Sequence, residues 1–139
     1  MTDPDLVAKK LALIETCVRE LRTLARVSAI PTDTVQERFA EHTLQIAIQA
    51  AIDVASHIVS DERLGEPRTN RDMMAALARN GWLPSSLAET IQRMVGFRNI
   101  LVHGYETVDV KIVQDIVEHR LDDLLRFAGI IRERLRDAR

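Results

Sequence analysis

The strongest constraint on the fold is the segment from Leu44 to Val59, which is apolar on most sides of a helix. Its polar side chains follow at spacings of four, four and three residues, so they form one narrow stripe. A helix covered in this way is typically central, with neighbours packed on several sides. The same polar interruptions exclude a membrane span, and we expect no membrane partner. The stripe consists of Gln45, Gln49, Asp53 and Ser56, and we expect it to be a narrow solvent or interface face.

Apolar spacings of three and four residues predict helices along the rest of the chain. A first helix begins at the Asp3-Pro4 pair, which supplies a cap and a first-turn proline, and Pro31 ends that element. Thr32 or Asp33 then caps the central helix, which runs to about Ser60.

Residues 61–70 form the clearest loop. Asn70 then caps a short helix that Gly81 closes. The next helix opens at Pro84 or Ser85, and its apolar side continues for several turns.

Gly104 ends that helix, and a last helix starts near Val108 and keeps its apolar spacing to the end. No useful strand alternation and no long linker is present in the sequence. We therefore expect an all-α protein, an up-and-down bundle of four long helices plus one short helix, with residues 1–139 as a single domain.

The composition fits a cytoplasmic protein. Cys17 is the only cysteine and has no partner for a disulfide. The acidic, polar N-terminus does not resemble a signal peptide. A net charge of −2 argues against a general nucleic-acid coat protein, although it leaves room for a local cationic site.

Residues 97–105, Phe-Arg-Asn-Ile-Leu-Val-His-Gly-Tyr, carry the candidate chemistry. Arg98 is a fixed cation that can neutralise a phosphate, and His103 can carry protons near neutral pH. Tyr105 adds a hydroxyl that can be modified. Arg98 and His103 lie about 140° apart around a regular helix, so one straight helix does not aim both side chains at one atom. Three arrangements would resolve this: the long Arg98 side chain bends toward His103, the last turn loosens at Gly104, or a symmetric homodimer brings two such helix ends together and completes the site.

The string Arg-Asn-Ile-Leu-Val-His-Gly-Tyr at the end of an apolar helix resembles the HEPN superfamily, and within it the HepT-like toxins. The resemblance implies a helical bundle that is typically a dimeric, metal-independent ribonuclease of toxin–antitoxin systems. It also implies catalytic roles for Arg98 and His103, and a partner nucleotidyltransferase antitoxin of the MntA type that adds AMP to Tyr105. The resemblance extends to residues 44–59, 71–74, 81–84 and 94–97.

The residues themselves suggest how RNA would be cleaved. The 2′-hydroxyl of RNA is the nucleophile, and imidazoles can deprotonate it and protonate the 5′-oxygen. Arg98 would stabilise the charge of the transition state, and Asn99 could hold the phosphate or orient His103. The expected products have a 2′,3′-cyclic phosphate and a 5′-hydroxyl, and no cofactor or metal is required.

Several residues have simpler explanations. Arg and His near a helix end often cap it, because cations suit that end of the dipole. We interpret His42, His57 and His119 as structural, and a zinc site is not expected because no two His are four residues apart. The arginines near the end of the last helix alternate with acidic residues, and we expect them to form a frayed, solvated end. These arginines are Arg132, Arg134, Arg136 and Arg139. We expect Phe97 and Trp82 to be core residues.

The sequence is compatible with two functions, one as an enzyme and one as a binding protein. The first is an endoribonuclease toxin that binds RNA and is neutralised by a nucleotidyltransferase antitoxin, with which it could form one hetero-oligomer. The alternative is a non-catalytic helical adaptor that binds a nucleotide or a substrate for a partner nucleotidyltransferase. A neighbouring reading frame with the Gly-Ser and Asp-x-Asp pattern of a nucleotidyltransferase would favour the first.

Overall fold

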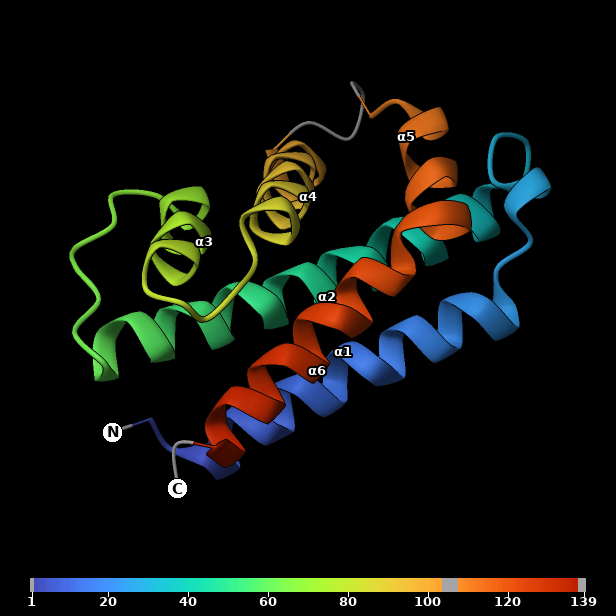
Figure 1. The fold of residues 1–139 in the computed structure, drawn as a ribbon. Helices are drawn as coiled ribbons and strands as arrows, with labels where there is room; N and C mark the ends of the chain where they lie inside the picture. Colours follow the sequence, from blue (N-terminus) through green and yellow to red (C-terminus); the bar gives the residue numbers. More distant parts are fainter. Residues whose placement is uncertain (1, 104–107, 138–139) are drawn as a thin grey trace.

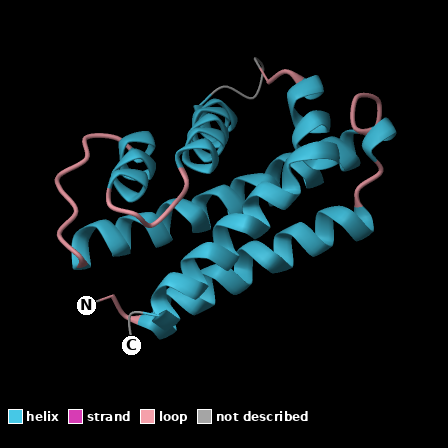
Figure 2. Ribbon diagram, viewed as in Figure 1, coloured by secondary structure: helices cyan, strands magenta, loops and turns pink. Residues whose placement is uncertain are grey.

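The computed structural model describes residues 2–103 and 108–137, and every regular element in these ranges is helical (Figures 1 and 2). The last three elements follow one another without a break and make one long helix. With it, the described ranges hold four long helices and one short one, which confirms the predicted all-α class. The elements are α1 (Pro4–Leu24), η1 (Val27–Ala29), α2 (Thr34–Asp61), α3 (Asn70–Arg79), α4 (Ser85–His103), α5 (Val110–Asp115), η3 (Ile116–Arg120) and α6 (Leu121–Asp137).

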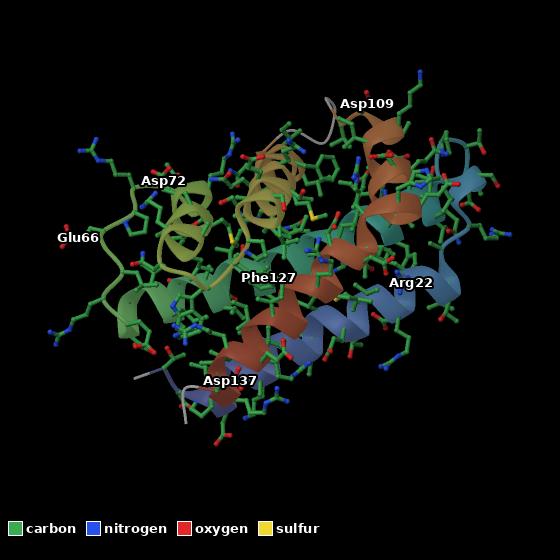
Figure 3. All side chains as sticks on the ribbon, in the orientation of Figure 1. Arg22, Glu66, Asp72, Asp109, Phe127 and Asp137 are labelled. Atoms are coloured by element: carbon green, nitrogen blue, oxygen red, sulfur yellow. The ribbon has the colours of Figure 1, made fainter. Side chains whose placement is uncertain are left out.

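Helix α2 is central, as its sequence predicts. It contacts α1, α3, α4, α5 and α6, and α1 and α6 also pack against each other (Figure 1). Helices α3 and α4 pack together on α2 (Figure 1). Phe127 of α6 is fully buried inside the bundle (Figure 3). Within the described ranges, no helix is long and apolar enough to cross a lipid bilayer.

Side chains cap the starts of the first three α-helices. The carboxylates of Asp3 and Asp33 accept hydrogen bonds from backbone N–H groups in the first turns of α1 and α2, which confirms both caps. The cap of α3 is Thr69, whose hydroxyl accepts from the Asp72 N–H at 3.1 Å. The expected Asn70 cap is therefore wrong by one residue, because Asn70 already has helical geometry.

Gly81 closes α3 with a left-handed backbone, φ +79°. The Trp82 N–H then reaches back to the Leu77 carbonyl at 2.8 Å, which satisfies an orphan acceptor of the last turn. Trp82 is buried, as predicted, and this turn leads into α4.

The final helix differs from the uninterrupted helix expected from Val108. Asp109 caps it by accepting from the Lys111 N–H at 2.9 Å, so the helix begins at Val110 (Figure 3). A π-helical turn then occupies Ile116–Arg120. The spacing of apolar residues does not reveal the extra residue of a π-turn, because Ile116 and Val117 within the turn are both buried and the apolar pattern continues through it.

The polar stripe of α2 is neither a simple solvent face nor a free interface. The Lys10 ammonium of α1 lies 3.0 Å from the Asp53 carboxylate, and Gln49 donates to the same carboxylate at 2.9 Å. Both Gln49 and Asp53 are half-buried. The middle of the stripe therefore fixes α1 against α2.

Two arginines near the end of α6 make ordered contacts with other helices or turns, which a frayed helix end would not make. Arg132 holds Glu15 of α1 with two hydrogen bonds of 2.8 and 2.9 Å. The Arg134 guanidinium lies 4.7 Å from the centre of the Trp82 ring, a cation–π contact. Both arginines are exposed, as expected, but these contacts with residues distant in sequence contradict a frayed end.

Candidate active site

Helix α4 positions the motif at the end of an otherwise apolar face. At about 100° per residue, Arg98 lies about 20° from Ile91 around the helix axis. Ile91 and Val95 are fully buried on this face, and Leu101 is buried one turn further along. Arg98 is consequently half-buried, with its aliphatic stem on the core side of α4.

The Arg98 guanidinium contacts its neighbour in sequence. Arg98 Nη1 donates a hydrogen bond of 3.2 Å to Asn99 Oδ1. Arg98 Nε is buried, and no acceptor among the described residues lies within hydrogen-bond distance of it. Because a guanidinium has five N–H donors, the bond to Asn99 leaves capacity for phosphate oxygens.

The other motif residues can be placed only in part. Helix α4 stays α-helical through His103, so positions 98 and 103 are separated by about 140° around the axis. For His103 the structure describes the backbone but not the side chain. Gly104 and Tyr105 lie outside the described residues. The structure thus brings Arg98 and Asn99 together, while the roles of His103 and Tyr105 and the homodimer stay predictions.

A groove of about 190 Å³ runs between α4 and the α5–η3 segment. We call it the α4–α5 groove. Its two arginines, Arg93 and Arg120, were not singled out by sequence reasoning, because only the packing of α4 against the final helix makes them neighbours. Arg120 Nε lies 3.7 Å from Asp115 Oδ2. The lining residues are Thr90, Arg93, Met94, Phe97, Ile112, Asp115, Ile116 and Arg120.

Sequence reasoning also missed a buried carboxyl in α2. Glu41 is only 6% exposed, and its Oε1 has no hydrogen-bond partner among the described residues. Burial raises the pKa of Glu41 to about 7, and the neighbouring Glu37 carboxyl adds to the rise, while Arg38 opposes it. An acid one turn before the apolar run at Leu44 was the available signal.

The remaining histidines lie away from any described cluster of ligands. His42 and His119 are exposed, and His57 is half-buried. Within residues 2–103 and 108–137, no group of three or more His, Cys, Asp or Glu side chains is placed to hold a metal ion.

Comparison with known proteins defines the class of this bundle. Residues 12–131 match the HepT-like family, described as ribonuclease HepT-like. The mRNA nuclease HepT of Shewanella oneidensis is 32% identical over 129 residues, which cover 92% of this chain and 97% of the relative. The tRNA nuclease HepT of Aphanizomenon flos-aquae is 31% identical over 109 residues, or 77% of this chain and 74% of the relative. The chain belongs to the HepT-like family of the HEPN superfamily.

Solved structures agree with this assignment. A toxin–antitoxin structure with AMP-PNP superposes with a TM-score of 0.87 at 31% identity, covering 93% of this chain and 98% of the other. A tri-AMPylated HEPN toxin of Shewanella oneidensis, in complex with its MNT antitoxin, has a TM-score of 0.86 at 31% identity and covers 96% of this chain and 99% of the other. The resemblance to HepT-like toxins is confirmed by these matches.

Proposed function

We propose that this chain is the toxin of a HepT/MntA-type toxin–antitoxin pair and a metal-independent endoribonuclease. The observation that carries the proposal is the half-buried Arg98 guanidinium at the end of α4, bound on one side by Asn99 and five residues before His103. The relatives named as mRNA and tRNA nucleases support RNA as the substrate.

The chemistry needs only these side chains and the substrate. The 2′-oxygen forms a bond to phosphorus while the bond to the 5′-oxygen breaks. A neutral His103 imidazole takes the 2′-hydroxyl proton, and a protonated imidazole gives a proton to the 5′-oxygen. Each role contributes roughly 10²–10⁴ in rate. Arg98 stabilises the negative charge on the phosphorus oxygens, and the products are a 2′,3′-cyclic phosphate and a 5′-hydroxyl.

We propose that the site is completed in a homodimer. One helix holds positions 98 and 103 about 140° apart, so a second copy supplies the other half of a shared cleft. Two copies also supply the two imidazoles that acid and base roles require.

We further propose that a nucleotidyltransferase antitoxin attaches AMP to Tyr105. The solved relative that is AMPylated and bound to an MNT antitoxin supports this regulation. The attached phosphate would pair with Arg98 in a charge-assisted contact and block RNA. Tyr105→Phe removes the acceptor hydroxyl, so the variant should escape neutralisation on coexpression with the antitoxin. The intact mass of the wild type should rise by one or more AMP units, and an increment that persists in Tyr105→Phe would refute Tyr105 as the acceptor.

Expression of the chain alone tests the proposed toxicity. Growth arrest should coincide with RNA fragmentation in the wild type, and both should disappear in Arg98→Ala. Arg126→Ala is the matched control, because Arg126 is an exposed arginine on α6. RNA that stays intact in arrested cells would instead favour the non-catalytic adaptor.

A further inference from the structure

The α4–α5 groove lies beside the proposed catalytic residues. Met94 and Phe97 line it from α4, the helix that also carries Arg98. At 1.5 Å per residue, Phe97 lies about 9 Å along the axis from His103. At about 100° per residue the two positions also lie about 120° apart around α4, so an RNA strand that reaches both has to curve around the helix.

The lining of the groove combines an apolar floor with cationic edges. Met94, Phe97 and Ile116 are mostly buried beneath it, while Ile112 is 44% exposed. Arg93 and Arg120 both line the groove and are exposed. A cationic groove that follows the backbone is one part of how proteins hold single-stranded nucleic acid, and here mostly aliphatic side chains stand where aromatic ones usually contact the bases.

The wall on the final helix is shaped by the π-turn. Ile116 and Arg120 are its first and last residues, and Asp115 directly precedes it. A π-turn is rare and appears frequently at functional sites. Here it places an apolar side chain, a carboxylate and a guanidinium in one wall of the groove.

We propose that the α4–α5 groove binds a nucleotide that flanks the scissile phosphate of the RNA substrate. Its base lies on the apolar floor, and its phosphates contact Arg93 and Arg120. This inference rests on the proposed ribonuclease function. It assigns to these residues a role in holding RNA that is separate from the chemistry at Arg98.

The size and charge of the groove favour this occupant. A volume of about 190 Å³ is below the roughly 300 Å³ at which sites for drug-sized molecules begin, so it fits a base better than a whole nucleotide. The two guanidiniums outnumber the single carboxylate of Asp115 among the lining residues, which suits a polyanion. The other possible occupant is a second copy of this chain, and the experiment must separate the two.

The test measures binding of a short single-stranded RNA to the full-length chain in a His103→Ala background, where the RNA should stay intact. The variant Arg93→Gln/Arg120→Gln should weaken the Kd at least tenfold. It should also reduce the slope of log K against log salt by about 1.4, because each phosphate contact to single strands contributes roughly 0.7. Arg126→Gln/Arg136→Gln is the matched control, since it removes two exposed α6 arginines whose ion pairs with Asp123 and Glu133 are long, at 3.9 and 3.7 Å.

A second arm tests the apolar floor. Replacing the flanking base by an abasic site should weaken binding by the wild-type groove several-fold, because the base loses its apolar contact with the floor. Ile112→Ser should bind the two RNAs with nearly equal Kd, because the exposed part of the floor is removed. Equal affinity of the unaltered groove for both RNAs would overturn the base site.

The outcomes distinguish failure of the proposed nucleotide site in the groove from failure of the proposed ribonuclease function. RNA cleaved in the His103→Ala background would refute the proposed mechanism. Intact RNA with an unchanged Kd and salt slope in Arg93→Gln/Arg120→Gln would overturn the groove alone. A change in sedimentation mass of that variant, without a change in RNA affinity, would show the groove to be an interface between copies.

Discussion

Asn99 Oδ1 accepts a hydrogen bond from Arg98 Nη1 at 3.2 Å, so the guanidinium of the motif is held by the residue that follows it. Adjacent helical residues do not normally face each other. The contact forms because the arginine side chain is long enough to bend toward Asn99. This contact with Arg98 differs from the two roles expected for Asn99 from the sequence, which were to hold the phosphate or to orient His103.

Removing this hydrogen bond should slow catalysis. Asn99→Ala releases the guanidinium into several rotamers, and we expect kcat to fall roughly tenfold, about 1.4 kcal/mol. The pH profile should keep its shape, because the imidazole is unchanged. Asn99→Gln, which retains an amide acceptor, should recover part of the rate. Cleavage by Asn99→Ala at the wild-type kcat would show that the contact has no role.

Glu41 should make stability depend on pH. Its folded-state pKa is about 7, above the usual 4.5, so the folded protein binds the proton more tightly than the unfolded chain. The free energy of unfolding should therefore fall as pH rises from about 4.5 to 7 and then level off with respect to this group.

Glu41→Gln removes that titration. The variant should be more stable than the wild type at pH 8, by up to about 3 kcal/mol, and nearly equal at pH 4.5. Urea unfolding at both pH values measures the difference. Exposed Glu89→Gln on α4 is the control and should change little. A Glu41→Gln variant that is equally destabilised at both pH values would contradict the raised pKa.

The Arg132–Glu15 pair should stabilise the packing of α6 on α1. Its two short hydrogen bonds hold the pair in one geometry, although both side chains are partly exposed. A double-mutant cycle with Arg132→Gln and Glu15→Gln should give a coupling of about 0.5–1 kcal/mol. The Arg136–Glu133 pair, at 3.7 Å on α6, should give almost none.

The Arg132–Glu15 pair should make the free energy of unfolding depend on pH with the opposite sign to Glu41. The hydrogen bond and charge of Arg132 lower the pKa of Glu15. Its stabilisation should be present above the unfolded pKa and should be lost as pH falls through the lowered value. A coupling that is undiminished in acid would contradict this assignment.

Two glycines should respond oppositely to alanine. Gly81 has φ +79°, which L side chains rarely adopt, so Gly81→Ala should cost about 1 kcal/mol. Gly129 lies inside α6 with nothing within 4 Å of an added Cβ, so Gly129→Ala should stabilise the chain by about 1 kcal/mol. Thermal unfolding of both variants checks the pair. If Gly129→Ala were destabilising, something outside the described residues must occupy that space.

The helices were predictable because each buries a regular apolar stripe, and α2 was recognisable as central because it is apolar on most sides. The caps at Asp3 and Asp33 followed from local side-chain chemistry. The cap at Thr69 was missed because Asn70 is an equally good capping residue in sequence. Local chemistry alone does not decide which of two neighbours leaves helical geometry first.

Long-range contacts could not be predicted in the same way. The contact of Arg132 with Glu15 joins residues 117 positions apart, and the α4–α5 groove exists only once two helices pack. The π-turn also escaped, because the residues around it keep apolar spacings compatible with an α-helix. Arg98 and Asn99 were identified from the motif, but their mutual hydrogen bond depends on a rotamer that sequence does not specify.

We propose that Arg98 and His103 cleave RNA without a metal. The most direct measurement is end-group analysis of a defined RNA incubated with the purified chain in excess EDTA. The wild type should release fragments ending in a 2′,3′-cyclic phosphate and beginning with a 5′-hydroxyl, while Arg98→Ala and His103→Ala should release none above background. Fragments with other ends, cleavage that stops in EDTA, or cleavage by both variants at the wild-type rate would contradict this mechanism.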